Sequence, residues 1–305
     1  MPELPDIEAY RAALAGRAVG RRLLGTRLRS VFLLRTVEPP LGAFEGRTLT
    51  GTRRIGKRLV LAFEEDASPL FLVLHLMLAG RLSWGKPGAG LPGRRGLAAL
   101  DFDGGTLLVT EAGSRRMASL HAAEGEAALA ELDPGGLEPL EAPLEVFVAA
   151  LRRERHTLKR ALTSPHLIAG IGGAYADEIL HAARLSPVAL TTSLDDAALA
   201  RLHQATQEVL RFWVERLGRA AREGGWPTVT AFQEGMAVHG RYRQPCPRCG
   251  DPVQRIRYAD RETDYCATCQ TGGTVLADRS LSRLLGKDWP RSLEAWEERV
   301  GRGSG

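Results

Sequence analysis

Most of this 305-residue chain contains no cysteine. Its four cysteines all lie between residues 246 and 269. A disulfide framework would spread its cysteines along the chain, whereas a metal site gathers them. Long apolar runs are missing too, so we expect no transmembrane helix. The opening, MPELPDIEAYRAAL, has no basic segment followed by an apolar one, so we expect no signal peptide. These absences favour a cytoplasmic protein without a membrane partner.

A large excess of one charge is absent as well. Lys and Arg number 41 against 36 Asp and Glu, which gives a formal net charge of +5. This balance permits a polyanionic partner such as a nucleic acid, but many proteins without such a partner are equally basic. Apolar residues make up 44% of the chain, as in ordinary globular proteins, and the length allows two domains and a small third one.

Residues 1–135 predict a β-rich domain that begins with a short helix. Pro5 and Asp6 stand at the start of this helix, and apolar residues follow at helical spacing. Short apolar runs, separated by glycines or charged turns, then predict an antiparallel sandwich or barrel. These runs are Thr26–Leu34, Leu59–Phe63, Leu70–Leu76, Leu97–Phe102 and Thr106–Thr110.

The chain becomes helical beyond residues 124–144, whose Ala, Glu, Pro and Gly content predicts a linker. In the strongest candidate helix, Ser193 is the expected N-cap and Gly218 the expected stop. The residues after 270 contain helical pieces and end in a Gly- and Ser-rich segment that we expect to be loose. The three candidate helices are Leu144–Leu162, Tyr175–Ala183 and Ser193–Leu217.

The cysteines form two pairs, Cys246 with Cys249 and Cys266 with Cys269, and each pair encloses two residues. Four thiolates complete the tetrahedral coordination of zinc with no open position, so we expect one structural Zn²⁺. Two disulfides or free thiols are the alternatives, and disulfides fit a cytosolic chain poorly. Arginines between the pairs are typical of a hairpin that binds nucleic acid, although a protein-binding ribbon has the same pattern.

The dipeptide Met1-Pro2 is a common opening that by itself indicates nothing. Removal of Met1 would free the secondary amine of Pro2, which could attack C1′ of a damaged nucleotide and expel the base. The resulting iminium is permanently cationic and is a strong electron sink for a later elimination. The neighbouring carboxyl group of Glu3 could act as the general acid. Many chains begin in this way by chance, so further residues are required.

Four ordered motifs resemble those of the formamidopyrimidine-DNA glycosylase and endonuclease VIII family. The opening MPELPDIE at residues 1–8 resembles the N-terminal motif of that family, and IGKR at residues 55–58 resembles its strand lysine. GIGGAYADE at residues 170–178 resembles its helix–two-turn–helix signature. The cysteines, with Arg261 and Thr263 before the second pair, resemble its zinc finger. The resemblance covers residues 1–270, and the tail lies outside it.

This resemblance implies an α+β multidomain fold. We expect an N-terminal antiparallel β-sandwich with an N-terminal helix, a central helical helix–two-turn–helix domain and a C-terminal zinc-finger hairpin. The corresponding segments are 1–135 for the catalytic sandwich, 136–235 for the DNA-binding domain, 236–270 for the zinc finger and 271–305 for a C-terminal tail.

The same resemblance implies a bifunctional DNA glycosylase and abasic-site lyase of base excision repair, which excises oxidised bases and then cuts the strand by β,δ-elimination. Pro2 would be its Schiff-base nucleophile and Glu3 its general acid. Lys57 would contact phosphate near the lesion and serve β-elimination, and Arg261 would grip the flanking phosphates and assist δ-elimination. Without the family context, Lys57 and Arg261 would be ordinary solvated cations. The implied partner is double-stranded DNA with damaged bases or abasic sites, bound by a monomer at the nucleoid.

The resemblance also implies a set of DNA contacts. A flipped base leaves a void in the duplex, and Leu78, Arg115 and Met117 are the expected fillers, with Arg115 facing the orphaned base. Lys159 is expected to touch DNA. The turn that follows Gly170 would point backbone N–H groups at a phosphate, where glycine lets the chain approach closely.

Several positions depart from the family pattern. Gly173 stands where the family usually has Asn, so one side-chain contact to phosphate is lost. Met117 replaces a usual Phe, and Asp6 replaces a usual Glu. The segment Gly225–Gln233 is short where the formamidopyrimidine branch usually has a longer loop over flipped 8-oxoguanine. Ring-opened purines and oxidised pyrimidines are therefore expected to be at least as good substrates as 8-oxoguanine.

Two other functions stay open. A family member that has lost base excision and only binds damaged or abasic DNA would explain the departures at Asp6, Met117 and Gly173. A zinc-ribbon interaction module fused to an unrelated β domain would explain the cysteines but not the N-terminal motif. Borohydride trapping on abasic-site DNA separates these hypotheses, because only lyase chemistry gives a covalent adduct.

Overall fold

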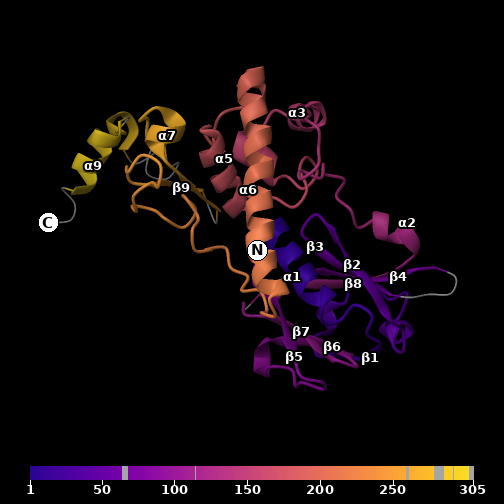
Figure 1. Ribbon diagram of the computed structural model, residues 1–305. Coiled ribbons are helices and arrows are strands. Elements are labelled where there is room, and N and C mark those ends of the chain that lie inside the picture. Colours follow the sequence, from indigo (N-terminus) through magenta and orange to yellow (C-terminus); the bar gives the residue numbers. More distant parts are fainter. Residues whose placement is uncertain (64–67, 114, 259–260, 278–284, 291, 302–305) are drawn as a thin grey trace. The chain divides into compact units, whose positions relative to one another are not determined.

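The computed structural model describes residues 1–305 apart from 64–67, 114, 259–260, 278–284, 291 and 302–305. The side chains of residues 258, 261, 287, 297 and 299–301 also lie outside the description. The chain forms two compact units, residues 1–136 with 211–231 and residues 137–210 with 232–305. Figure 1 shows the elements of both units with the labels used below.

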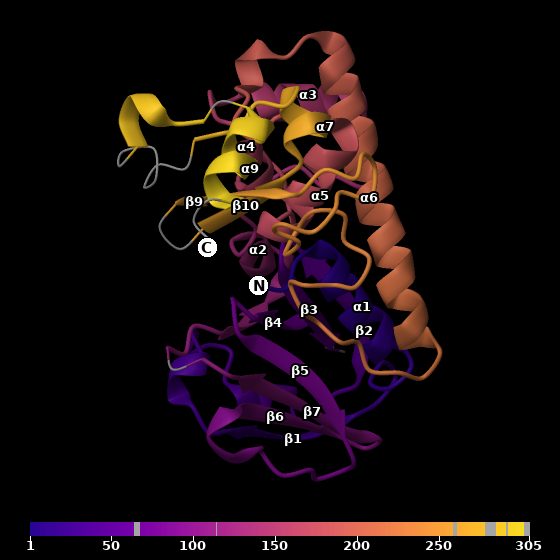
Figure 2. The same ribbon diagram turned by 90° about the vertical axis from the view of Figure 1, so that its left-hand side faces the viewer.

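The first unit contains two antiparallel four-stranded sheets (Figures 1 and 2). The strand order is β1–β6–β7–β5 in one sheet and β2–β3–β4–β8 in the other. The bounds of its elements are α1 Leu4–Ala15, β1 Leu23–Leu28, β2 Leu49–Ile55, β3 Arg58–Phe63, β4 Leu70–His75, β5 Gly80–Gly85, β6 Gly96–Phe102, β7 Gly105–Glu111, β8 Ser119–Glu124 and α2 Gly125–Ala130.

One apolar core lies between the two sheets. Leu107 from the first sheet and Leu61 from the second belong to the same cluster of buried side chains. Helix α1 adds Tyr10, whose hydroxyl accepts the backbone N–H of Leu82 at 3.2 Å. The ring of Trp226 lies 5.8 Å from the ring of Tyr10, so the returning segment 211–231 also contributes to this unit. The predicted N-terminal helix and antiparallel sandwich are confirmed.

The helical part of the second unit is divided more finely than the sequence predicted. The helix expected over Leu144–Leu162 is two helices, α3 (Leu144–Arg152) and α4 (Leu158–Thr163). Helix α5 spans Gly173–Ala183. Helix α6 spans Asp196–Arg222, and its cap is Asp195, not Ser193, because Asp195 Oδ1 accepts the N–H of Ala198 at 2.7 Å. The same helix continues past Gly218, which therefore does not end it.

The cysteine region of the second unit is a hairpin followed by a short helix. Strand β9 (Gln254–Tyr258) pairs with β10 (Arg261–Tyr265), and α7 (Ala267–Thr271) follows. The predicted helical pieces of the tail include α9 (Leu293–Gly301), whereas the end expected to be loose lies outside the described residues. Short 3₁₀ segments complete the chain at Val31–Leu33, Leu41–Phe44, Gly93–Arg95, Thr191–Ser193 and Gly286–Asp288.

These elements confirm the α+β fold with a sandwich, a helical part and a cysteine hairpin. The division into four segments stays a prediction, and residues 211–231 group with the sandwich rather than with the helices around them in sequence. Within the described ranges, no helix is both long enough and apolar enough to cross a membrane.

Candidate functional site

Pro2 and Glu3 lie at the buried start of helix α1. Pro2 is buried, and Glu3 and Asp6 are only 5% and 2% exposed. The backbone N–H of Glu3 donates to Asp6 Oδ2 at 2.8 Å, so the first turn of the helix fixes the residue next to Pro2. Asp6 Oδ1 has no hydrogen-bond partner among the described residues. A buried carboxylate with an unpaired oxygen is costly, which favours the protonated form of Asp6.

Burial changes the acid–base properties of this region. It raises the pKa of Asp6 to about 7, although the hydrogen bond from Glu3 N–H acts in the opposite direction. Burial also lowers the pKa of the Met1 amino group. The Glu3 carboxylate opposes this decrease, whereas the positive charges of Arg81 and Lys57 lower the pKa further. An amine with a lowered pKa is neutral, and therefore nucleophilic, over a wider pH range.

Lys57 lies in the two-residue turn between β2 and β3, where Ile55 pairs with Arg58. Gly56 has a φ of 56°, the left-handed conformation that this turn requires. Arg54 fixes the turn, since its Nε donates to Glu8 Oε1 of helix α1 at 2.9 Å and its NH1 donates to Gly56 O at 3.0 Å. Burial lowers the pKa of Lys57 and the Glu3 carboxylate opposes the shift, so Lys57 and Glu3 share one electrostatic environment.

Arg81 is a residue of this site that sequence reasoning missed. Its positive charge helps to lower the pKa of the Met1 amino group. Its Nε donates to Val229 O at 2.8 Å, and its NH1 donates to Gly80 O at 2.7 Å and to Leu78 O at 3.2 Å. These bonds hold the guanidinium between strand β5 and the returning segment. The sequence shows only an arginine at the start of an unpredicted strand, and this gives no signal of the contact.

Leu78, one of the three predicted fillers, is exposed at the turn between β4 and β5. It is 64% exposed. The turn is tight, because Gly80 N–H donates to Leu76 O at 2.9 Å and Met77 has a φ of 52°. A Cβ on Gly80 would clash with the backbone of Leu76, so glycine is required there. A tight turn that presents an apolar side chain is suited to enter a base stack.

The other two predicted fillers lie on the connection between β7 and β8. Arg115 is exposed and Met117 is half-buried. The backbone N–H groups of Met117 and Ala118 donate to the buried carboxylate of Glu111 at 3.0 and 3.3 Å. Glu111 therefore shapes the end of this connection and sets where Met117 stands.

The glycine-rich turn leads into the N-terminus of helix α5. Gly170 has a φ of 78°, in the left-handed region, and Gly172 is the N-cap residue. Gly173 is exposed at the first helical position, and a Cβ added there would meet no atom within 4 Å. The N-terminus of a helix favours anions electrostatically, so this turn could receive a phosphate.

The acidic pair Asp177 and Glu178 of α5 organises the chain around it, a role that sequence reasoning did not assign. Glu178 accepts the backbone N–H groups of Ala237, Val238 and His239 at 2.7, 2.9 and 2.9 Å. Burial raises the pKa of Glu178, and these hydrogen bonds oppose the shift. The segment before the first cysteine is thereby attached to the helix–two-turn–helix signature.

Lys159, predicted to touch DNA, lies in a buried ion network. Its side chain is 13% exposed, and its Nζ donates to Asp177 Oδ1 at 2.7 Å and to Glu262 O at 2.6 Å. His239 Nδ1 lies 2.9 Å from Asp177 Oδ2 and 3.8 Å from Asp264 Oδ2. Burial lowers the pKa of His239, but the two carboxylates outweigh it and raise the pKa above its ordinary value. Asp177, His239 and Asp264 could together hold a metal ion. The ammonium group of Lys159 is already bonded to Asp177, so the three residues fit an ion network better than a metal site.

The four cysteines form a cluster of the size that a zinc ion requires. All four Sγ atoms lie within 4.8 Å of one another, with Cys249 to Cys266 at 3.4 Å and Cys246 to Cys269 at 4.0 Å. Sulfurs at about 2.3 Å from a tetrahedral zinc lie roughly 3.8 Å apart. A disulfide would require about 2.05 Å, so that alternative does not fit. His181 Nε2, 3.3 Å from Cys246 Sγ, adds a contact outside the ligand set.

The predicted site residues are therefore distributed over both units. Pro2, Glu3 and Lys57 all belong to the first unit, where the charge of Glu3 acts on Lys57, and the same unit carries Leu78, Arg115 and Met117. Lys159, Gly173 and the cysteines belong to the second unit. The backbone of Arg261 pairs with Tyr258 at the start of β10, and its side chain lies outside the described part of the chain.

Three family profiles match successive parts of the chain. The formamidopyrimidine-DNA glycosylase N-terminal domain matches residues 1–120, and the formamidopyrimidine-DNA glycosylase H2TH domain matches residues 136–223. The zinc finger found in FPG and IleRS matches residues 243–272. Residues after 272 lie outside all three matches.

Known proteins resemble the chain over a similar extent. The formamidopyrimidine-DNA glycosylase of Acidovorax sp. (strain JS42) is 34% identical over 283 residues, which cover 88% of this chain and 99% of that protein. Lactococcus lactis Fpg, solved with abasic-site DNA, has a TM-score of 0.77 at 26% identity over 88% of this chain and 99% of that one. MutM (Fpg) from Thermus thermophilus has a TM-score of 0.74 at 33% identity over 88% and 98%. This chain belongs to the formamidopyrimidine-DNA glycosylase family.

Proposed function

We propose that this chain is a DNA glycosylase of base excision repair that also cleaves the strand as an abasic-site lyase, with Pro2 as its nucleophile. The observation that carries the proposal is the buried start of α1, where Pro2, Glu3 and Asp6 are buried and where the charges of Glu3 and Lys57 act on the chain's amino group. Family membership supports damaged DNA as the partner, because a relative was solved with abasic-site DNA.

The first chemical step joins Pro2 to the sugar. Once Met1 is removed, the neutral nitrogen of Pro2 attacks C1′, and the bond between C1′ and the base breaks. The departing base keeps the electron pair of that bond and takes up the proton that the amine loses. Glu3 then protonates O4′, the sugar ring opens, and an iminium forms between the Pro2 nitrogen and C1′.

The second stage cuts the strand on both sides of the sugar. Loss of a proton from C2′ sends electrons into the iminium and breaks the bond between C3′ and its phosphate oxygen. A second elimination breaks the bond at C5′, and water releases Pro2. Lys57 and Arg261 would hold the departing phosphates, the first residue for β-elimination and the second for δ-elimination.

The setting of the amine supports this chemistry. The burial that lowers the pKa of the Met1 amino group would act on the Pro2 nitrogen one residue away. A protonated amine has no lone pair, so a lowered pKa increases the nucleophilic fraction at neutral pH. Asp6 fixes the backbone of Glu3, and the Glu3 side chain in turn accepts the backbone N–H of Asp6, so the acid is held at the start of α1.

DNA contacts outside the chemistry follow the family pattern. Leu78, Arg115 and Met117 would fill the void left by a flipped base, and the exposed turn at Gly173 would face a phosphate. A phosphate contact by Lys159 would have to share its ammonium group with Asp177 and Glu262. Lys159 therefore has a second candidate role, which is to position the hairpin that carries Arg261.

The lesion we favour is a ring-opened purine, with oxidised pyrimidines or 8-oxoguanine as further substrates. Trp226 attaches the start of the short segment Gly225–Gln233 to the sandwich, since its Nε1 donates to Leu82 O at 2.7 Å. Few residues are then left for a loop over 8-oxoguanine, which makes that base the weakest of the three candidates.

One structural zinc ion is proposed for the four cysteines, because their thiolates leave no position for a substrate. The ion would keep the β9–β10 hairpin folded, and with it the position of Arg261. We further propose that the protein acts as a monomer on chromosomal DNA, and therefore in the cytoplasm at the nucleoid.

Borohydride reduction in the presence of an abasic-site duplex tests the nucleophile. The expected product is a covalent adduct whose DNA-modified peptide is the N-terminal one that begins with Pro2. Intact-mass analysis of the same preparation should show a chain without Met1. A preparation with an uncleaved N-terminal extension, and the Pro2→Gly variant, should lose most of the adduct.

The controls separate the proposal from its alternative, an impaired family member that only binds damaged or abasic DNA. Lys57→Ala should still give the N-terminal adduct while cutting the strand more slowly, because Lys57 is placed at the elimination step. Binding of the duplex without any adduct would favour the impaired member. Strand cleavage by chains that all retain Met1 would overturn the proposed chemistry.

A further inference from the structure

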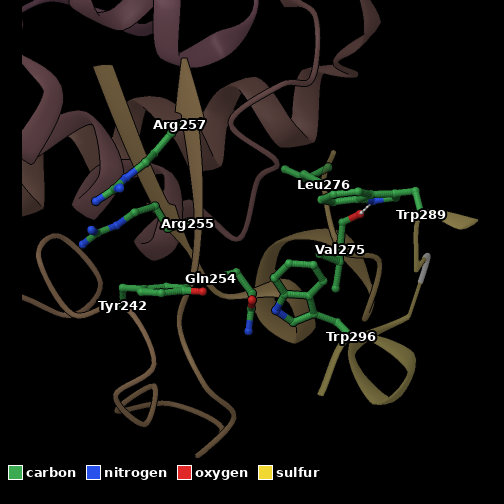
Figure 3. Close-up of a pocket in the computed structure, with 8 residues that line it drawn as sticks. All are labelled: Tyr242, Gln254, Arg255, Arg257, Val275, Leu276, Trp289 and Trp296. Carbon is green, nitrogen blue, oxygen red and sulfur yellow. Dashed lines mark hydrogen bonds between the residues drawn. The ribbon is translucent and has the colours of Figure 1, made fainter. Parts of the chain in front are cut away.

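The residues after the zinc finger fold back and close a small cavity, shown in Figure 3. The cavity volume is about 200 Å³. Half of its lining comes from β9 and the loop before it, and half comes from the tail: Tyr242, Gln254, Arg255, Arg257, Val275, Leu276, Trp289 and Trp296. The tail half lies beyond residue 272, where the last family match ends. The cavity is thus formed partly by a segment that no family match covers.

The tail is attached to the finger by specific hydrogen bonds. The N–H of Leu276 donates to the hydroxyl of buried Tyr265 at 2.8 Å. Thr274 forms an antiparallel bridge with Ser292, and the N–H of Leu293 donates to Gly273 O at 3.2 Å. These bonds return the chain to the finger after the segment that lies outside the description, so both tryptophans are brought to the same cavity.

The two tryptophans form an aromatic wall. The rings of Trp289 and Trp296 lie 5.5 Å apart at 36°, and both residues are only partly buried. Trp289 Nε1 donates to Val275 O at 3.4 Å, which fixes the orientation of one indole. At a centroid distance of 5.5 Å the two rings leave no room for a third ring between them. A planar ligand would therefore stack on an outer face of the pair.

Two arginines line the opposite side, and no carboxylate among the described residues lines the cavity. Arg255 Nε is held by Asp264 at 2.9 Å, and Arg257 Nε is held by Glu262 at 2.9 Å. The guanidinium carbon of Arg255 also lies 5.1 Å from the ring centroid of Tyr242. These contacts orient two cationic groups beside an aromatic wall, and both acids come from β10, outside the lining.

We propose that this cavity binds one unpaired nucleotide, with its base stacked on the tryptophan pair and its phosphate on Arg255 and Arg257. Stacking and arginine contacts are the two interactions by which proteins hold single-stranded nucleic acid without reading sequence. The volume is below the roughly 300–1,000 Å³ of sites for drug-sized ligands, which suits a single planar ring system. The proposal depends on the cavity lining alone and not on the proposed chemistry at Pro2.

Fluorine NMR on protein labelled with 5-fluorotryptophan tests the proposal on the full chain. The chain has five tryptophans, so the signals of Trp289 and Trp296 can be assigned with single Trp→Phe variants. The ligands are single-stranded dA5 and free dAMP. We expect a saturable shift of at least one of these two signals with dA5. A response to dAMP alone would assign the cavity to a free nucleotide, which still supports the proposal.

Two variants and a matched control distinguish this cavity from DNA contacts elsewhere. Trp296→Leu should weaken binding, read at the Trp289 signal, roughly 5- to 150-fold, the loss of one base–aromatic stack. Arg257→Gln, which leaves the aromatic packing in place, should weaken it roughly tenfold. Arg201→Gln, an exposed arginine on α6, should leave it unchanged. Absence of any shift with either ligand, or shifts whose affinity neither cavity variant alters, would overturn the proposal.

Discussion

Asp6 illustrates how one side chain can combine a structural and an acid–base role. Its Oδ2 caps the start of α1 through the N–H of Glu3, while its Oδ1 has no partner among the residues that the structure describes. The sequence indicated only that Asp6 stands at the start of the helix and replaces the Glu usual in the family. The structure adds that this carboxyl group is buried and that its pKa is raised to about 7.

Asp6→Asn should remove a pH dependence from the stability of α1. The folded state keeps the Asp6 proton up to about pH 7, whereas the unfolded chain releases it near 3.8. The folded state binds more protons between these values, so its stability falls as the pH rises. At pH 8 we expect the amide variant to be more stable by on the order of 1–3 kcal/mol, and the difference should disappear toward pH 4.

Hydrogen exchange of the α1 amides at pH 5 and pH 8, corrected for intrinsic rates, measures this effect. Asp103→Asn changes an exposed carboxyl group of the same unit and serves as the control. An equal change in α1 protection at both pH values would show that burial of Asp6 does not carry the predicted penalty.

Gly173 offers a second test at the scale of a single residue. A Cβ meets no atom within 4 Å there, so the Asn usual in the family fits without rearrangement. Gly173→Asn should restore one hydrogen bond to phosphate and raise the affinity for an abasic-site duplex roughly 3- to 10-fold. Gly173→Ala adds the same Cβ without the amide and is the matched control. Equal affinities of the two variants, measured by fluorescence anisotropy, would remove this position from the phosphate contact.

At the scale of elements, burial decided which strands could be predicted. The inner strands β3, β4, β6 and β7 are almost entirely buried and appear in the sequence as continuous apolar runs. The edge strands β2, β5 and β8 are partly exposed and mix small, polar and charged residues, so no pattern marked them. The remaining edge strand, β1, spans Leu23–Leu28, whereas the sequence predicted a strand over Thr26–Leu34. Most residues of β1 are half-exposed, so they form no continuous apolar run.

The candidate site divides in the same way. Pro2, Glu3, Lys57 and the cysteines belong to short local motifs, so their sequence alone indicated them. Arg81 and the ion network of α5 depend on contacts between segments far apart in the chain. Asp177 and Glu178 stood inside a recognised signature, yet their partners at residues 237–239 and 264 could not be read from it.

The buried pair of Lys159 and Asp177 should be important for the stability of the second unit. Asp177→Asn leaves the ammonium of Lys159 without its charged partner, and such a loss costs about 3–5 kcal/mol in a buried site. The exposed pair of Arg152 and Asp196 is the comparison, and Asp196→Asn should cost less than about 1 kcal/mol. Urea unfolding followed by circular dichroism measures both, and a similar small cost for the two variants would contradict the role of the network.

At the scale of the whole molecule, zinc removal should affect the two units differently. Cys246→Ala or chelation should unfold the hairpin and lower the affinity for DNA, while the sandwich stays folded. A metal assay should find one zinc per chain in the parent protein and none in the variant. Hydrogen exchange should show lost protection at β9 and β10 and unchanged protection at β3 and β4. Unchanged DNA affinity would remove the hairpin from the DNA interface.

The returning segment 211–231 has a consequence for how the protein is made. Its Trp226 and Val229 complete the packing of a sandwich whose other residues end at 136, so residues 137–210 are an insertion within that unit. A ribosome that adds about 5–20 residues per second would leave the sandwich incomplete for on the order of ten seconds. A gene fragment that stops at residue 136, where the first part of this unit ends, should therefore yield an aggregating product, whereas fusion of residues 211–231 to its C-terminus should rescue its solubility.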